Sequence, residues 1–187
     1  MRVVGGKSGG VPLTVPKRGT RPTSDKVRGA LFSMINEFIE GSKCPDLFAG
    51  SGALGLEALS RGAESCVFVD MGKESCLAIS SNLKKTRLEK GFVKRQVAKS
   101  YIQNCNNSFD VIFADPPYGE KNIGKRSESF AQQLLDDENL PSLLKANGSL
   151  ILGHTKRDTL EISNPWQLRK TLKHGDTLIE MIDLIEA

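Results

Sequence analysis

The apolar positions of this chain fall into short continuous runs that alternate with stretches of helical spacing. The runs expected to form strands are Asp46 to Phe48, Cys66 to Val69, Phe92 to Val97, Phe109 to Ala114 and Leu150 to Leu152. The stretches expected to be helical are Leu54 to Leu59, Cys76 to Leu83, Phe130 to Leu135 and Ser142 to Lys145. Strands that alternate with helices predict a mainly parallel sheet with helices on both faces.

The two ends of the chain break this alternation. Near the start, two short valine-rich runs flank Gly9 and Gly10 and predict a small β-hairpin. Thr23 or Ser24 is expected to cap a helix that continues to Gly41. Near the end, Leu168 to Leu172 and Leu178 to Ile185 flank a turn, which predicts an antiparallel hairpin at the sheet edge. We therefore expect a basic extension over residues 1–22 and one main domain over residues 23–187.

Composition adds few constraints. The 187 residues suit a single domain, and 39% hydrophobic with 26% charged residues is ordinary for a globular protein. No apolar run is long enough to cross a membrane, and the first residues lack the apolar core of a signal peptide, so a cytoplasmic protein is expected. Four scattered cysteines and two histidines indicate neither a metal site nor a disulfide framework.

Positive charge is concentrated in two segments, although the net charge is only +4. The first segment is rich in Gly and Pro and predicts contact with phosphate groups. Its residues assigned to that role are Arg2, Lys7, Arg18, Arg21 and Arg28, together with Thr23. For Thr23 and Arg28 the alternative is a helix cap and a solvated first helical turn. The second segment has seven cations between Lys84 and Lys99 against Glu89, and a solvated surface is the preferred interpretation there.

Asp115, Pro116, Pro117 and Tyr118 directly follow an apolar strand, so they are expected at its carboxyl end, where open α/β sheets bind ligands. A carboxylate and a carbonyl held by two prolines can accept the hydrogens of an exocyclic amine. Tyr118 can stack on the ring that bears this amine, and Pro117 can contact it. These contacts suit methylation of an aromatic amine; the alternative is a proline turn with a buried tyrosine.

Gly50 to Gly55 spell a glycine-rich turn between a strand and a helix, and two cofactors fit it. A dinucleotide would place its pyrophosphate on the helix amino terminus. S-adenosylmethionine is cationic, and a site for it needs a carboxylate before the glycines, as Asp46 provides. Asp70, at the end of the next strand, can accept both ribose hydroxyls in either case. The remaining alternative is a tight turn with Asp46 as an exposed cap.

Asp46, Asp70 and Asp115 are all expected at the carboxyl ends of parallel strands, which favours a methyl donor beside an amine acceptor. The cofactor contacts expected at this edge are Asp46, Phe48, Ala49, Gly50, Gly52, Asp70 and Met71. The catalytic residues expected there are Asp115, Pro116 and Tyr118. No metal is expected.

The run DLFAGSGALGLEALSRGA, Asp46 to Ala63, closely resembles the cofactor signature of the bacterial small-subunit ribosomal RNA guanine-N2 methyltransferases called RsmD. Arg21 to Thr23, Asp115 to Tyr118 and Gly175 to Thr177 are also similar to that family. The resemblance implies a Rossmann-like class I methyltransferase fold, with a mostly parallel seven-stranded sheet, an antiparallel C-terminal hairpin and a small N-terminal hairpin. It further implies S-adenosylmethionine as donor and a guanine of 16S ribosomal RNA as acceptor. The expected partner is this RNA or the assembling or assembled small ribosomal subunit, and a monomer is expected.

Alternatives within this fold are methylation of DNA adenine or of a protein glutamine, and a ribosome-binding factor without activity. A dehydrogenase does not explain the Asp115 tetrapeptide. The chain departs from the family pattern at Gly29, Pro45 and Gly153, and at Lys99 with Ser100, where an acid often contacts the adenine. These departures leave the length of the first strand and the recognition of adenine open.

Overall fold

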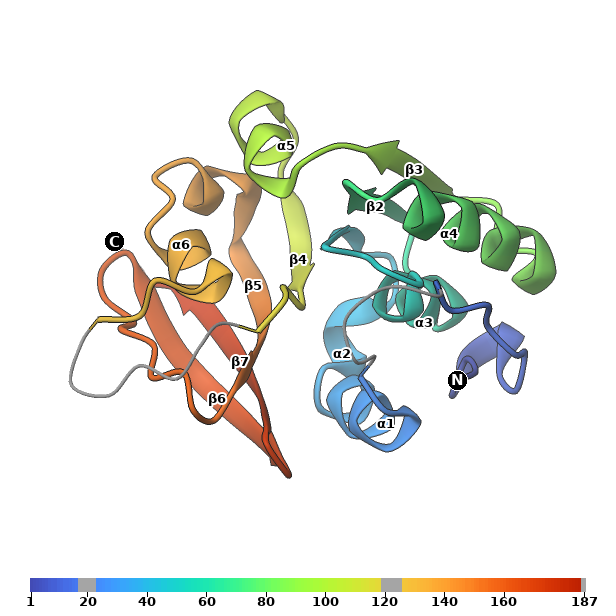
Figure 1. Ribbon diagram of the computed structural model, residues 1–187, viewed down its shortest axis with the longest axis horizontal. Helices are drawn as coiled ribbons and strands as arrows, with labels where there is room; N and C mark the ends of the chain where they lie inside the picture. Colours follow the sequence, from blue (N-terminus) through green and yellow to red (C-terminus); the bar gives the residue numbers. More distant parts are fainter. Residues whose placement is uncertain (17–22, 119–125, 186–187) are drawn as a thin grey trace.

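The computed structural model describes residues 1–16, 23–118 and 126–185, and it has a seven-stranded sheet at its centre (Figure 1). The strand order is β3-β2-β1-β4-β5-β7-β6. The strands are β1 (Lys43–Leu47), β2 (Ser65–Asp70), β3 (Gly91–Arg95), β4 (Phe109–Ala114), β5 (Leu144–Thr155), β6 (Trp166–His174) and β7 (Thr177–Leu184). Strands β1 to β5 pair in parallel, whereas β7 is antiparallel to both of its neighbours. The expected parallel sheet with an antiparallel C-terminal hairpin is confirmed.

Helices cover both faces of the sheet. The helical elements are η1 (Gly6–Ser8), α1 (Asp25–Met34), α2 (Asn36–Ile39), α3 (Ala53–Ser60), α4 (Lys73–Thr86), α5 (Ala98–Asn104), α6 (Phe130–Leu135) and η2 (Leu140–Leu143). Residues of α1 to α4 form one buried apolar cluster with the sheet, and residues of α5, α6 and η2 form another on the opposite face. Alternate residues of β4 join opposite clusters, Phe113 the first and Ile112 the second, as expected of a strand buried on both faces. No helix in the described ranges has the length and apolarity to cross a membrane.

The N-terminal segment differs from the expected hairpin. The Val3 amide donates to the Val11 carbonyl at 3.0 Å, but within residues 1–16 only one isolated bridge forms, between Arg2 and Pro12, and η1 lies inside the loop. The amides of Val4 and Gly5 donate instead to the carboxylate of Glu57 on α3, at 2.7 and 2.8 Å. Because these amides bind a side chain of α3, the segment docks against that helix and does not form two regular strands.

Two helical expectations need correction, and one helix was missed. The helix after Ser24 is interrupted at Ile35, which ends α1 before the short α2. Residues Ser142 to Lys145 were expected to be helical, but the 3-10 helix η2 ends at Leu143 and Leu144 already pairs with Phe109 in the sheet. Helix α5 was not expected, because its seven residues bury only three side chains, too short a pattern to reveal a helical period.

Pro45 lies within β1 and limits the pairing of that strand. β1 pairs with β2 along all five residues, including Pro45 with Val67, but it pairs with β4 only from Asp46 on. Proline has no N–H to donate to a ladder. Before Pro45, the amide of Lys43 donates to the side chain of Asp110 at 2.8 Å. The first strand is therefore short on its β4 side, and it still delivers Asp46 to the carboxyl edge of the sheet.

Candidate active site

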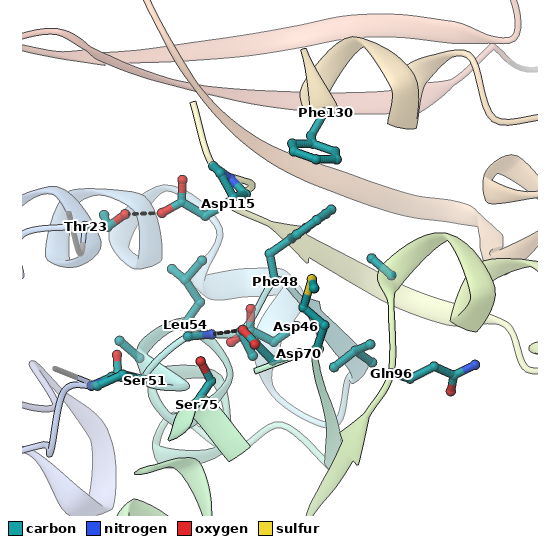
Figure 2. A pocket seen from close by; sticks show the side chains of 18 of the residues that line it. Thr23, Asp46, Phe48, Ser51, Leu54, Asp70, Ser75, Gln96, Asp115 and Phe130 are labelled. Atoms are coloured by element: carbon teal, nitrogen blue, oxygen red, sulfur yellow. Dashed lines mark hydrogen bonds between the residues drawn. The ribbon is translucent and has the colours of Figure 1, made fainter. Parts of the chain in front are cut away.

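A cavity of about 350 Å³ opens at the carboxyl ends of β1, β2 and β4. Asp46, Asp70 and Asp115 all line it, so the structure brings together the three carboxylates that the sequence placed at strand ends. Figure 2 shows Asp46 and Asp70 close together below Phe48, and Asp115 beside Thr23 on another side of the cavity. Among the described residues that line the cavity there is no Lys, Arg or His.

Asp46 is a buried carboxylate at the end of β1, with an exposed fraction of 2%. Its Oδ2 accepts a hydrogen bond of 2.9 Å from the amide of Gly55 in the first turn of α3. Burial raises the pKa of Asp46 well above its ordinary value, the Gly55 amide lowers it, and the nearby Asp115 and Asp70 raise it further. Asp46 is not an exposed cap, and a positively charged ligand in the cavity would relieve this repulsion.

Asp70 ends β2 and holds the glycine-rich turn in place. Its Oδ2 accepts from the amide of Gly50 and its Oδ1 from the amide of Gly72, both at 2.8 Å. The Gly50 amide is thus engaged by a carboxylate, whereas a pyrophosphate-binding turn directs its amides at the ligand. The electrostatics of this turn favour a cation over a phosphate.

The turn itself depends on unusual backbone conformations. Gly50 and Gly52 have φ values of +56° and +77°, and Phe48 has φ of +60°, a region that bulky residues rarely adopt. A Cβ on Gly55 would meet the Phe68 ring at 2.4 Å, so α3 can approach β2 only because this residue is glycine. The expected cofactor contacts that line the cavity include Phe48, Ala49, Gly50 and Met71. Gly52 is the N-cap residue of α3 and is not among the lining residues.

Asp115 follows β4 and is partly buried. Thr23 Oγ1 donates a hydrogen bond of 2.6 Å to Asp115 Oδ2. Burial raises the pKa of Asp115, and this hydrogen bond opposes the rise. Gly153 on β5 leaves space for the other oxygen, because a Cβ there would lie 2.5 Å from Asp115 Oδ1.

The rest of the tetrapeptide faces different surroundings. Pro117 lines the cavity, but Pro116 and Tyr118 are not among its lining residues. Tyr118 has an exposed fraction of 42%, and its hydroxyl lies 3.4 Å from Thr177 Oγ1 at the start of β7. The structure therefore brings Tyr118 to the C-terminal hairpin beside the cavity.

Sequence reasoning missed several lining residues, of which Phe130 and Gln96 are the most informative. Phe130, the first residue of α6, has an exposed fraction of 49%, and its ring centroid lies 6.0 Å from that of Phe48 (Figure 2). Gln96 follows β3 and donates to Ser100 Oγ at 3.1 Å. The available signals were an aromatic directly after the helix cap Ser129 and a polar residue at a strand end.

The basic residues of the N-terminal segment separate into two groups. Arg2 and Lys7 are exposed, and Arg2 pairs with Asp25 at 3.5 Å. Arg28 is fully buried: it pairs with Asp25 at 2.9 Å and lies 3.6 Å from the buried Glu57. The phosphate contact expected of Arg28 is therefore not accessible in this structure, and its alternative as a solvated residue of the first turn is also wrong.

Two expected phosphate contacts, Arg18 and Arg21, lie outside the described residues. Thr23, the remaining member of that group, points to Asp115 in the cavity, and Ser24 is the residue that caps α1, through the amide of Val27. The cavity is also lined by Val15 and Pro16, so the N-terminal segment reaches it from the side of α4.

Comparisons with known proteins agree with this geometry. The chain is 34% identical over 180 residues to the ribosomal RNA small subunit methyltransferase D of Haemophilus influenzae, covering 94% of this chain and 89% of the relative. It is 43% identical over 128 residues to the putative rRNA methyltransferase YlbH of Bacillus subtilis, covering 66% of this chain and 70% of that protein.

Two solved structures share the fold. The putative methyltransferase yhhF of Escherichia coli superposes with a TM-score of 0.77 at 27% identity, over 98% of this chain and 97% of the other. A putative methyltransferase complexed with SAH superposes with a TM-score of 0.64 at 15% identity, over 86% of this chain and 49% of the other, and it supports the fold alone. The family model described as Conserved hypothetical protein 95 matches residues 1–183. The chain belongs to this family, which is that of the ribosomal RNA small subunit methyltransferases D.

Proposed function

We propose that this protein transfers a methyl group from S-adenosylmethionine to the N2 amine of a guanine in small-subunit ribosomal RNA. The observation that carries the proposal is the cavity itself, in which Asp46, Asp70 and Asp115 converge without a cation among the described lining residues. Such a site favours a ligand with positive charge and disfavours the pyrophosphate of a dinucleotide.

The residues present fit S-adenosylmethionine. Asp46 and the backbone of Phe48 to Gly50 would hold the amino acid end, with the Asp46 carboxylate towards its ammonium group, and Asp70 would accept hydrogen bonds from the ribose hydroxyls. Gln96, which lines the cavity after β3, is the polar side chain that would meet the adenine, since Lys99 and Ser100 are not among the lining residues. The bound donor supplies a methyl group activated by a positively charged sulfur. The fold is shared with a putative methyltransferase whose structure was solved in complex with SAH.

The acceptor half of the site is formed around Asp115. Because Thr23 occupies Oδ2, Oδ1 is the oxygen left to accept a hydrogen from the guanine amine. The Pro116 carbonyl would accept the second hydrogen, and together they would localise the nitrogen lone pair towards the methyl group. Attack needs the reacting atoms at roughly 3 to 3.5 Å, so orientation contributes most of the rate, and the amine proton leaves to solvent afterwards.

The base itself needs an apolar face to rest on. Phe130 presents a half-exposed ring to the cavity next to Phe48, so we assign stacking of the base to Phe130 and place Tyr118 at the rim. Pro117, which also lines the cavity, would contact the base. A base inside a folded RNA must leave its stack to reach this depth. The exposed Arg2 and Lys7, with Arg18 and Arg21, are assigned to the RNA backbone.

Relatives and charge narrow the acceptor to ribosomal RNA. The Haemophilus influenzae relative is named a ribosomal RNA small subunit methyltransferase, and the basic N-terminal segment suits a nucleic acid. The decisive experiment maps methylated nucleosides in 16S ribosomal RNA from cells with and without the gene, and then repeats the transfer in vitro with purified protein. N2-methylguanine that appears only with the wild-type gene supports the proposal, whereas methyladenine or an unmodified RNA would overturn it.

Two measurements separate chemistry from binding. Asp115→Ala is expected to retain affinity for S-adenosylhomocysteine and to lose most turnover. A thermal-shift comparison should show stabilisation by S-adenosylhomocysteine and none by NAD, because only a ligand of the native site stabilises the fold. Wild-type turnover in Asp115→Ala would remove the acceptor assignment while leaving the cofactor assignment in place.

A further inference from the structure

The two basic segments of the sequence form one surface in the fold. η1 docks against the carboxyl end of α4, where Ser8 Oγ donates to the Thr86 carbonyl at 2.8 Å, and the Thr14 amide bonds the side chain of Asn82 at 2.8 Å. A second cavity, of about 250 Å³, lies at this junction, and Lys7, Arg87 and Lys90 all line it. Lys7 thus joins residues 80 positions away in the sequence. Figure 1 shows the blue N-terminal segment next to α3 and α4.

From this junction the basic surface continues along the free edge of the sheet. β3 is the edge strand, and it carries Lys94 and Arg95 after Lys90. Arg95 Nε donates to the Met71 carbonyl at 3.3 Å, and Met71 lines the candidate active site. At about 3.3 Å per residue, Lys90 and Arg95 lie roughly 16 Å apart. The surface therefore extends from the α4 end to the rim of the active site.

Several cations elsewhere on the molecule have acidic partners, whereas those of this surface have none among the described residues. Arg126 pairs with Asp136 and Glu161, Lys145 with Asp110, and Lys156 with Asp176. In contrast, no ion pair within the described residues involves Lys7, Lys84, Lys85, Arg87, Lys90, Lys94, Arg95 or Lys99. Glu89 is the one acid of the segment between Lys84 and Lys99. Unpaired cations along one edge create a local positive potential that attracts a polyanion.

We propose that this surface, defined as Lys7, Arg87, Lys90 and Arg95, binds the phosphodiester backbone of the substrate RNA. The assignment rests on the proposed function, and it extends the RNA contact beyond the N-terminal segment to α4 and β3. Phosphate contacts of this kind position the RNA and carry no sequence information. The RNA backbone would run along this surface from the rim of the active site towards the cavity between η1 and α4.

The test uses substitutions that remove the charge and keep a polar side chain. Arg87→Gln and Lys90→Gln are compared with Lys170→Gln, an exposed lysine without an ion pair on β6, the opposite edge strand. RNA affinity is measured at salt concentrations from about 50 to about 200 mM. Over this range, affinity that depends on phosphate contacts changes strongly. Each substitution in the surface is expected to reduce the salt slope of log K by about 1, and the double variant by about 2, whereas Lys170→Gln leaves it unchanged.

Turnover supplies a second readout. The double variant should raise KM for RNA with kcat and affinity for S-adenosylhomocysteine unchanged, since it removes binding that the ground and transition states share. A salt slope and KM equal to those of Lys170→Gln would overturn the proposal and leave this edge a solvated surface. Failure of the wild-type protein to bind or methylate small-subunit RNA would instead overturn the proposed function, so the two failures are distinguishable.

Discussion

The hydroxyl of Thr23 donates to Asp115 Oδ2 across 2.6 Å, which joins the residue before the α1 cap to the residue after β4. Burial raises the pKa of Asp115, and this hydrogen bond is the contact that opposes the rise. Thr23 is separated from Asp115 by 92 positions, so the link belongs to the fold and no local motif contains it. It suggests that Thr23 sets both the rotamer and the ionisation of Asp115.

Replacing Thr23 by Val should therefore change the pH dependence of catalysis. The ionised Asp115 is the acceptor of the amine hydrogen, so activity is present above its pKa and is lost as the pH falls through it. Without the hydroxyl, the pKa rises further and the acidic limb of the profile moves to higher pH. Thr23→Ser, which keeps the hydroxyl, should retain the wild-type limb. Coincident profiles of kcat/KM for wild type and Thr23→Val would contradict the assignment.

Gly153 is expected to be indispensable because of the space it leaves. A Cβ at this position would lie 2.5 Å from Asp115 Oδ1, so Gly153→Ala should displace the carboxylate. A shift of about 1 Å in a reacting group can cost on the order of 100-fold in rate. Gly29→Ala is the matched control, since its Cβ would meet Val4 at an ordinary 3.4 Å. Comparable kcat in the two variants would show that Asp115 tolerates the displacement.

Phe130 should matter for the acceptor and not for the donor. Loss of a stacking ring costs about 1 to 3 kcal/mol per base, so Phe130→Ala should raise KM for RNA or lower kcat/KM by roughly 10- to 100-fold. Phe130→Trp should restore most of this, because any aromatic face can stack. Leu168→Ala removes an apolar side chain of similar exposure on β6, outside the lining of the active site and on the opposite edge of the sheet from β3, and serves as the control. Equal effects of Phe130→Ala and Leu168→Ala would exclude a stacking role.

Arg28 should act on stability and not directly on RNA. Its guanidinium is fully buried between Asp25 and Glu57 and also donates to the Thr23 carbonyl at 3.2 Å. Removing one partner of a buried ionic network typically costs about 3 to 5 kcal/mol. Arg28→Ala should therefore lower the free energy of unfolding in urea by about that amount. If Arg28→Ala left the unfolding midpoint unchanged and weakened RNA binding, the structural role would be wrong and Arg28 would be a contact to RNA phosphate.

The carboxylates of the site were predictable because each follows an apolar strand directly in the sequence. Parallel pairing fixes which edge such residues reach, so Asp46, Asp70 and Asp115 could be expected to converge. Contacts between distant segments were not predictable. The burial of Arg28 depends on Glu57, a residue with nothing in its helical context to mark it as the partner of two backbone amides and two arginines.

The failures at secondary structure have similar causes. Helix α5 has seven residues with three buried side chains, too few to show a helical pattern in the sequence. The start of β5 at Leu144 depends on its pairing with Phe109 of β4, a contact between distant parts of the chain. The two basic segments were assigned different roles from sequence because charge runs do not indicate proximity. Only the docking of η1 on α4 places Lys7 beside Arg87 and Lys90.

Asp46 and Asp110 provide opposite tests of how buried charge affects stability. Burial and two neighbouring carboxylates raise the pKa of Asp46 in the folded protein, so the ionised carboxylate is less favourable there than in the unfolded chain, and the fold loses stability as the pH rises above the unfolded pKa. Asp46→Asn should thus raise the free energy of unfolding of the ligand-free protein by roughly 1 kcal/mol, and it should abolish affinity for S-adenosylhomocysteine.

For Asp110, burial acts to raise the pKa, but hydrogen bonds from Lys145 and the Lys43 amide outweigh it and hold the pKa below its ordinary value. That stability is present above the unfolded pKa and lost as the pH falls, so Asp110→Asn should destabilise the protein at pH 7 and leave ligand affinity intact. Urea unfolding and calorimetric titration of both variants measure the two effects. If Asp46→Asn destabilised the protein, the negative charge of Asp46 would be balanced by groups of the protein itself. That outcome would contradict the conclusion that the cavity favours a cationic ligand.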